Sequence, residues 1–284
     1  MKNLIFFFLI SLMSNSSAQE DWLNIGHDRT RSVSGLTLLG DHTMVVHDNK
    51  RDYEGRIGMV RIDQEKVTYQ RLEWPNEKLP FDLEALTTLP GSLTDMIAME
   101  SQGKCHWLIF DQAKMKLAYN GYIQIPGIKW PTNLEGFDIQ SFGKKNLAVW
   151  GHRGKSQYPG KLYWGWMDLA KRAVEPLDSL EISIPWPTEH VRHIADLKLD
   201  AAGDCWISAT SDPGDDGPFS SAIYQIGQFK ISDKQISFHL NSNETPTFKF
   251  EHHKVEAFDL KEKGILVATD DENNGGFIKE VFFK

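Results

Sequence analysis

Short runs in which apolar and polar residues alternate fill most of the chain after residue 20, and Gly, Asp, Asn and Pro separate them. Runs of this kind, rich in β-branched and aromatic residues, predict β-strands, whereas helical periodicity is hard to find. One run is unusual, because residues 81–90 (FDLEALTTLP) place Glu84 inside an otherwise apolar strand. A buried carboxylate is strongly destabilising unless hydrogen bonds, a counter-charge or a metal ion compensate it.

The segment around Glu84 is one of five copies of a pattern. Each copy has an apolar residue, a variable residue, a small residue and a large apolar residue, then a turn and a second apolar run. The copies read SVSGLTLLGDHTMVVHD, DLEALTTLPGSLTDMIAME, NLEGFDIQSFGKKNLAVWGH, HIADLKLDAAGDCWISATSD and KVEAFDLKEKGILVATDD. The variable positions, spaced by 50, 51, 60 and 61 residues, are Ser34, Glu84, Glu135, Ala195 and Glu256. This period is typical of a propeller blade.

Each copy continues into a third strand-like run, and the first four copies continue into a fourth. The fifth copy lacks that fourth run, and the segment EDWLNIG (residues 20–26), which precedes the first copy, could supply it. Such closure would remove the exposed edges of an open sheet. We therefore predict one all-β domain over residues 19–284, a five-bladed β-propeller closed by an N-terminal strand. A six-bladed ring is the alternative.

The repeat also predicts a polar ring, because the first strand of each propeller blade lines the central channel. Carboxylates brought close together repel each other unless protons or a cation neutralise them. Ca²⁺ is the favoured cation, since it accepts an irregular number of oxygen ligands, whereas Mg²⁺ or a water network without an ion are alternatives. The set lacks Cys and His, which disfavours zinc or copper. The predicted ligands are Ser34, Glu84, Glu135 and Glu256.

The fourth copy departs from this ring, because Ala195 stands at its variable position. Asp196, the next residue, could reach inward only from a shifted strand.

The same topology predicts that one face of the ring carries the chemistry. Segments that precede the first strands or follow the second strands open on this face, and they hold most of the clustered His, Arg and acidic residues. The turns on the opposite face have ordinary turn composition. The segment GHRG is the strongest candidate, because flanking Gly lets the backbone approach a ligand and Arg matches phosphate or carboxylate oxygens. The candidate reactive residues are His152, Arg153, Arg192 and Asp271.

The N-terminal residues predict export. Residues 1–18 contain one basic residue, a short apolar run, and Ser16 and Ala18 at the positions preferred before a cleavage site, as in a secretory signal. Later runs are too short or too polar to cross a membrane. We therefore expect a periplasmic or extracellular protein that has no membrane insertion after signal cleavage.

Composition narrows the partners further. The chain has 31 basic and 39 acidic residues and a net charge of -8, which disfavours nucleic acid. Its two cysteines, Cys105 and Cys205, lie in strand-like apolar segments. They could form one disulfide, but two buried thiols are the favoured interpretation.

The repeated motif of Glu, a small residue and an apolar residue resembles the secreted five-bladed propellers of the calcium-activated nucleotidase (apyrase) kind. It also resembles the looser group of bacterial phytase-like secreted propellers. The resemblance covers the repeat framework of the mature chain and implies a calcium ion in the channel, held by Ser34, Glu84, Glu135 and Glu256. Ala195 departs from this pattern, and the nucleotide-gripping residues have no match here.

Two functions of different class remain open. The first is metal-dependent phosphoester hydrolysis, in which calcium in the channel would polarise a phosphoryl oxygen and Arg153 and Arg192 would hold the anion. Water would be oriented by His152 or by an acidic residue, Asp270, Asp271 or Glu272. A serine nucleophile has no support, because neither a G-x-S-x-G elbow nor a P-loop is present.

The second is a noncatalytic, calcium-stabilised propeller that binds a glycan, a peptide or an envelope component. Tyr158, Trp186 and Trp130 near the loops would suit stacking on sugars. In both cases we expect a monomer whose partner is a small anionic molecule or a glycan.

Overall fold

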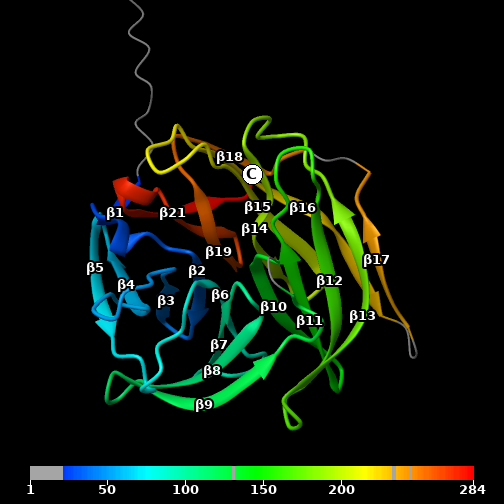
Figure 1. Ribbon diagram of the computed structural model, residues 1–284, viewed down its shortest axis with the longest axis horizontal. Helices are drawn as coiled ribbons and strands as arrows, with labels where there is room; N and C mark the ends of the chain where they lie inside the picture. The colour runs from blue at the N-terminus through cyan, green and yellow to red at the C-terminus, as the bar shows by residue number, and fades with distance from the viewer. Residues whose placement is uncertain (1–21, 130–131, 232–234, 243–244) are drawn as a thin grey trace, which may run out of the picture.

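The computed structural model describes residues 22–129, 132–231, 235–242 and 245–284. Over these ranges the chain forms 21 β-strands and two short 3-10 helices, Arg29–Arg31 and Glu272–Asn274. The strands form five antiparallel sheets, which are arranged as blades around one axis (Figure 1). The predicted five-bladed β-propeller is therefore confirmed, and the six-bladed alternative is wrong.

Four blades consist of consecutive strands that run outward from the channel. The first blade contains β2 (Gly35–Leu39), β3 (His42–Val46), β4 (Ile57–Asp63) and β5 (Lys66–Leu72). The second contains β6 (Leu83–Thr88), β7 (Asp95–Glu100), β8 (Lys104–Asp111) and β9 (Lys116–Gln124). The third contains β10 (Leu134–Phe142), β11 (Lys145–His152), β12 (Gly160–Asp168) and β13 (Ala173–Ile182). The fourth contains β14 (Val191–Leu199), β15 (Asp204–Ser211), β16 (Ser220–Ile231) and β17 (Ile236–Leu240).

The fifth blade joins the two ends of the described chain. Its order is β19 (Val255–Lys261), β20 (Gly264–Thr269), β21 (Gly276–Phe282) and β1 (Leu23–Gly26). β1 pairs antiparallel with β21, with Leu23 opposite Ile278. Closure by an N-terminal strand is confirmed, and it gives β21 a partner on its outer edge. Residues 20 and 21 of the predicted segment, and the predicted signal, lie outside the described residues.

The fourth blade has one strand that the sequence did not predict. β16 is 12 residues long, and its outer edge pairs with β17 at one end and with β18 (Phe248–Glu251) at the other. The chain thus returns along the same edge before it enters the fifth blade.

The small residue of each repeat lies where neighbouring inner strands meet. β2 packs against β6, β6 against β10, β10 against β14, β14 against β19, and β19 against β2. A Cβ atom on Gly136 would lie 2.7 Å from the main-chain nitrogen of Leu197, and one on Gly35 would lie 2.8 Å from that of Leu86. Only a very small side chain fits this approach.

Aspartates on the inner strands reinforce these contacts. Oδ2 of Asp138 accepts a hydrogen bond from the main-chain nitrogen of Leu199 at 2.6 Å. In the fifth blade, Oδ2 of Asp259 accepts one from the main-chain nitrogen of Leu38 at 2.7 Å. These acceptors tie one blade to the next.

The hydrophobic cores lie between adjacent blades. One core, for example, combines Leu147 and Val149 of β11 with Ile194 and Leu197 of β14. Cys105 and Cys205 are both buried and unpaired, so the interpretation as buried thiols is confirmed. Burial raises the pKa of both thiols. Among the residues described, no helix is long and apolar enough to span a membrane.

Candidate functional site

Three repeat glutamates occupy one structural position, an extra residue in the inner strand. In the second blade, Leu83 pairs with Glu100 and Ala85 pairs with Met99, so Glu84 has no residue opposite it. The register shifts in the same way at Glu135 in β10 and at Glu256 in β19. A bulge of this kind redirects a side chain.

These bulges bring the predicted carboxylates together. Glu84 is 8% exposed, Glu135 1% and Glu256 2%. Burial raises the pKa of Glu84 well above its usual range, and the charges of Glu135 and Glu256 raise it further. Ser34 is buried as well, and its hydroxyl accepts a hydrogen bond from the main-chain nitrogen of Asp48 at 3.1 Å. The structure thus places all four predicted ligands in the buried interior at the channel end of the inner strands.

The fourth blade supplies a cation to this ring. The pairing of β14 with β15 skips from Arg192 to Asp196, and the methyl group of Ala195 is buried. Nη1 of Arg192 lies 3.1 Å from Oε1 of Glu256 and 3.7 Å from Oε1 of Glu135. Nη2 of Arg192 donates to Oδ2 of Asp212. Burial opposes the charge, but these three carboxylates raise the pKa of Arg192 above its ordinary value.

Asp196 does not complete the ring. Its Oδ2 accepts from the main-chain nitrogen of Phe258 at 3.0 Å, and its Oδ1 accepts from that of Leu197 at 2.8 Å. Burial raises the pKa of Asp196 to about 8, against the opposing charge of Lys198. This carboxyl therefore belongs to the contact between the fourth and fifth blades.

Two further cations contact the ring from the rim. Nη1 of Arg153 lies 3.1 Å from Oε1 of Glu135, which also accepts a hydrogen bond from Nδ2 of Asn133 at 3.0 Å. Nζ of the buried Lys254 lies 3.5 Å from Oε1 of Glu256.

Lys254 also neutralises acidic residues that follow β20. Its Nζ is 2.6 Å from Oε1 of Glu272 and 3.5 Å from Oδ2 of Asp270. Burial opposes ionisation of Asp270, but the charge of Lys254 lowers the pKa of Asp270 to about 2. Lys254 directly precedes the first strand of the fifth repeat, so the topology puts it on the charged face, but nothing in the sequence indicates that it is buried.

Glu84 is the ring carboxyl that neither Arg192, Arg153 nor Lys254 contacts directly. It has no hydrogen bond or ion pair within the described part of the chain. The nearby ammonium of Lys50 pairs instead with Oδ1 of Asp82 at 2.7 Å. Burial and the charge of Asp270 raise the pKa of Asp48, the next carboxyl along the rim, to about 6. An excess of carboxyl groups therefore remains on this side of the ring.

Two predicted catalytic residues, His152 and Asp271, are held by local hydrogen bonds, and their catalytic roles stay predictions. His152 is half-buried at the end of β11, where its Nδ1 accepts from the main-chain nitrogen of Gly154 at 3.2 Å. Burial lowers the pKa of His152, and the charge of Arg153 lowers it further. Asp271 is 2% exposed, and its oxygens bind Nδ1 of His253 at 2.6 Å and the main-chain nitrogen of Lys254 at 2.7 Å. Asp271 therefore orients the start of the fifth blade.

The observed arrangement does not fit a calcium ion. Ca²⁺ takes six to eight oxygen ligands. Here the guanidinium of Arg192 lies between Glu135 and Glu256, 3.7 Å and 3.1 Å from their Oε1 atoms, where an ion bound by both carboxylates would have to lie. Within the described ranges, no group of three or more His, Cys, Asp or Glu side chains is arranged to hold a metal ion. Calcium binding by this set stays a prediction.

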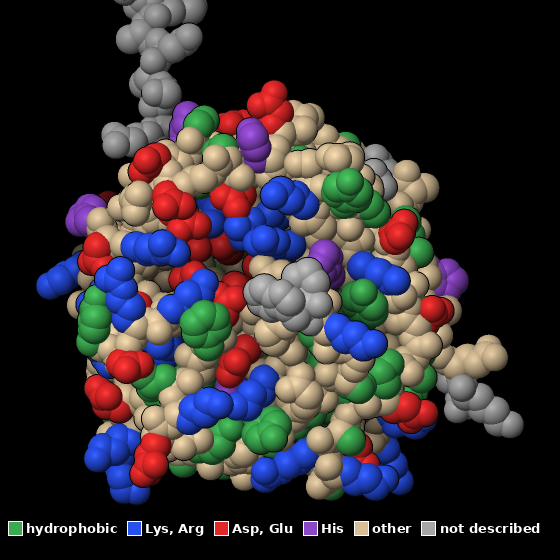
Figure 2. All heavy atoms as spheres, in the orientation of Figure 1, with side chains coloured by type: hydrophobic (Ala, Val, Ile, Leu, Met, Phe, Trp, Pro, Cys, Tyr) green, Lys and Arg blue, Asp and Glu red, His purple; other side chains and the backbone are tan. Residues whose placement is uncertain are grey.

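Exposed aromatic side chains stand on loops of the same face. Tyr53 is 68% exposed between β3 and β4, Phe81 is 60% exposed before β6, and Tyr158 is 67% exposed between β11 and β12. Trp186 instead packs against the core between the third and fourth blades, and Trp130 lies outside the described residues. Figure 2 shows acidic and basic side chains gathered near the centre of one face.

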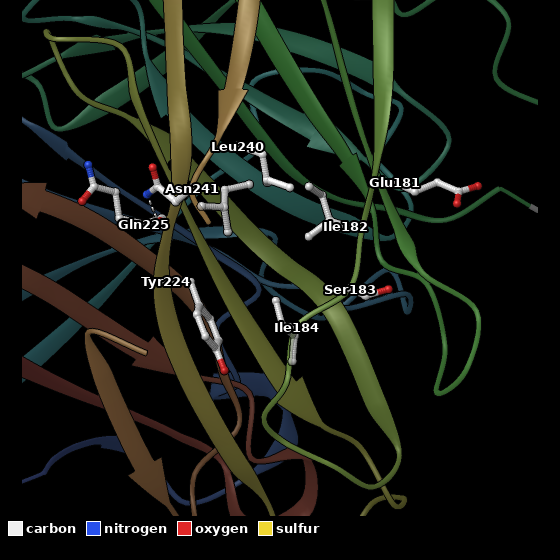
Figure 3. A pocket seen from close by; sticks show the side chains of 9 residues that line it. Glu181, Ile182, Ser183, Ile184, Tyr224, Gln225, Leu240 and Asn241 are labelled. Carbon is white, nitrogen blue, oxygen red and sulfur yellow. Dashed lines mark hydrogen bonds between the residues drawn. The ribbon is translucent and has the colours of Figure 1, made fainter. Parts of the chain in front are cut away.

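A separate cavity of about 320 Å³ lies between the third and fourth blades (Figure 3). Its apolar lining includes Ile182, Ile184, Ile226 and Leu240. Glu181 is the one charged residue in that lining, and its side chain points away from the others in Figure 3. The cavity therefore lacks the clustered charges of the channel mouth.

The comparisons with known proteins support the fold. The sequence matches no protein-family model and no curated protein. Among solved structures, a GH43 endo-arabinanase from Bacillus licheniformis is 10% identical, with 92% of this chain and 97% of that chain covered and a TM-score of 0.52.

The extracellular domain of a one-component system from B. thetaiotaomicron is 12% identical, with a TM-score of 0.37. The match covers 87% of this chain but only 27% of that longer chain. At such identities, the likeness to the arabinanase indicates a shared β-propeller fold. The narrower kinship with nucleotidase or phytase-like propellers stays a prediction.

Proposed function

We propose that the protein is an exported propeller that binds a glycan at the mouth of its channel. The observation that carries this proposal is the combination, on one face, of exposed aromatic rings with interleaved acidic and basic side chains. A sugar offers apolar ring faces that stack on aromatics and hydroxyls that both donate and accept hydrogen bonds. A mixed rim therefore suits it better than a rim of one charge.

The rim of the second blade supplies one such combination. Nζ of Lys50 lies 5.6 Å from the centre of the Phe81 ring and 2.7 Å from Oδ1 of Asp82. Phe81 would stack on a sugar face, while Lys50 and Asp82 bind its hydroxyls. Tyr158 and Arg153 would contact the same ligand from the third blade, where the Arg153 side chain is 31% exposed.

The comparisons are consistent with a glycan. The similar arabinanase is, by its name, an enzyme that acts on one. That likeness concerns the fold alone, so the proposal rests on the side chains at the channel mouth. The predicted export to the periplasm or beyond would place this protein where envelope polysaccharides occur.

Calcium-dependent phosphoester hydrolysis has less support. The two arginines expected to hold a phosphate already contact Glu135, and Arg192 also contacts Glu256. The remaining excess of carboxyl groups would repel an anion unless a metal ion reversed the local field. The enzyme proposal therefore depends on an ion that the observed arrangement does not fit.

Titration calorimetry of the purified mature chain with soluble neutral and uronic-acid-containing polysaccharides tests the proposal. We expect saturable binding that Phe81→Ala and Tyr158→Ala each weaken about tenfold, as the loss of a stacking contact implies. Tyr122→Ala is the matched control, because Tyr122 is 52% exposed on the outer strand β9, away from the mouth. Size-exclusion chromatography would check the expected monomer.

Other results would contradict the glycan proposal. Absence of binding to every polysaccharide, or equal weakening by Tyr122→Ala, would remove the glycan proposal. Release of phosphate from nucleotides, phytate or aryl phosphates in millimolar calcium would favour the hydrolase instead.

A further inference from the structure

We propose that Arg192 is the resident cation of the glutamate ring, in the place that a divalent metal ion would otherwise take, so that the folded channel is independent of metal. This inference does not depend on the proposed glycan ligand, because it concerns only what neutralises the buried carboxylates.

The contacts of Arg192 are those of a central cation. One nitrogen, Nη1, is 3.1 Å from Oε1 of Glu256 in the fifth blade and 3.7 Å from Oε1 of Glu135 in the third. The other terminal nitrogen, Nη2, holds Asp212, which follows the second strand of the fourth blade. The guanidinium therefore joins carboxylates of the third, fourth and fifth blades. Its delocalised charge and several donors suit this role.

The fourth blade lacks an oxygen ligand at Ala195 and supplies the guanidinium of Arg192. Ala195 stands where the other copies have Ser or Glu, and its methyl group offers no oxygen to an ion. Arg192 lies three residues earlier, where β14 stops pairing with β15 until Asp196. We interpret the loss of an oxygen ligand at Ala195 and the gain of the guanidinium as two parts of one replacement.

A second cation strengthens the exclusion of metal. Nζ of Lys254 is 3.5 Å from Oε1 of Glu256, the same oxygen that Arg192 contacts. A divalent ion at this point would meet two positive charges at short range, in a buried setting where screening is weak.

Removal of the guanidinium should let the ring carboxylates draw in a metal ion. Glu84 is more than nine-tenths buried and has no hydrogen bond or ion pair among the described residues. The charges of Glu135 and Glu256 act directly on it. With Arg192 replaced by a neutral residue, three buried carboxyl groups would share one cation fewer. Carboxylate and amide oxygens are the ligands that Ca²⁺ prefers.

Thermal melting of the mature protein, with millimolar calcium or with EDTA, tests this inference. We expect the wild-type Tm to be the same in both. The Arg192→Gln protein should melt at a lower temperature in EDTA, and saturating calcium should raise its Tm by about 5 °C, because calcium binds only the folded state. Arg153→Gln is the matched control, since Arg153 contacts only Glu135 of the ring and is 31% exposed. Its Tm should not respond to calcium.

Each other outcome would overturn the inference. A wild-type Tm that falls on chelation would show that the native ring holds a metal ion. A folded Arg192→Gln protein that responds to calcium no more than wild type would show that Arg192 does not stand in for one. If the variant cannot be isolated folded, its refolding yield with and without calcium replaces melting, and a yield that calcium does not raise also overturns it.

Discussion

Lys198 in the fourth blade is bonded to Leu86 in the second, across the channel. Nζ of Lys198 donates a hydrogen bond to the main-chain oxygen of Leu86 at 2.7 Å. Lys198 is 2% exposed, and its Nζ lies 4.0 Å from Oδ2 of Asp196. The charges of Asp138 and Asp259 also act on it. This lysine neutralises a second buried acidic layer, further along the inner strands than the glutamate ring.

Replacement of Lys198 by methionine should strongly destabilise the fold. The substitution removes the hydrogen bond to Leu86 and the positive charge that opposes the rise in the pKa of Asp196 and Asp138, so the free energy of unfolding should fall by about 1–3 kcal/mol. Urea denaturation would measure the loss. Lys171→Ala is the control, because the Lys171 side chain is 80% exposed and its ion pair with Asp168 lies at the surface, so a change below about 0.5 kcal/mol is expected. Similar losses in both variants would contradict this account.

The pKa of His47 should make the fold sensitive to acid. Burial lowers the pKa of His47 from 6.5 to about 4. As the pH falls from 6.5 to 4, the unfolded chain takes up a proton that the folded protein refuses, so stability is lost in this window. The difference corresponds to about 3 kcal/mol. The free energy of unfolding, measured against pH, should therefore depend less on pH in His47→Gln than in wild type between pH 4 and 6.5.

Asp48 provides a control of opposite sign for that experiment. Burial raises the pKa of Asp48 from 3.8 to about 6. The folded protein binds this proton before the unfolded chain does, so Asp48 adds stability as the pH falls from 6 towards 3.8. Asp48→Asn should therefore steepen the acid loss that His47→Gln flattens. A parallel pH dependence in the two variants would rule out this assignment.

The closing strand should contribute measurably to stability. Ile25 on β1 is 8% exposed and packs in the core between the fifth and first blades. Ile25→Ala should lower the free energy of unfolding by about 2–4 kcal/mol in urea denaturation. The neighbouring Asn24→Ala should have a much smaller effect, because the Asn24 side chain makes only an exposed contact with His27. Equal effects would show that β1 is not packed as described.

The contact between inner strands should reject even one methyl group at Gly136. A Cβ atom there would lie 2.7 Å from the main-chain nitrogen of Leu197, so one strand must shift. Gly136→Ala should lower the free energy of unfolding by about 1–3 kcal/mol. Gly143→Asn at a turn is the control, because a Cβ there meets nothing within 4 Å and Asn tolerates its φ of +63°. An unchanged stability for Gly136→Ala would contradict the packing argument.

The ring of glutamates can be predicted from the sequence, but the cations that neutralise it cannot. The repeat identified Glu84, Glu135 and Glu256 as equivalent, and the structure places each in a bulge of an inner strand. The sequence predicts that Arg192 holds a ligand anion, because its position before a strand indicates the face of the ring on which it lies. That position does not indicate which carboxylates it contacts. Lys198 was not singled out, since a lysine in a strand is usually solvent-exposed.

By itself, the sequence determined an all-β repeat and predicted five blades, the closing strand and the face that carries the charged loops, while the structure excluded the six-bladed alternative. These features follow from local alternation and from a period, both of which are readable along the chain. The tertiary structure alone decided what neutralises the buried carboxylates, because Arg192, Lys198 and Lys254 reach partners on other blades or other strands. The partner of a long charged side chain depends on which groups lie within its reach and on how deeply they are buried. Both are set only when the five blades have closed into a ring.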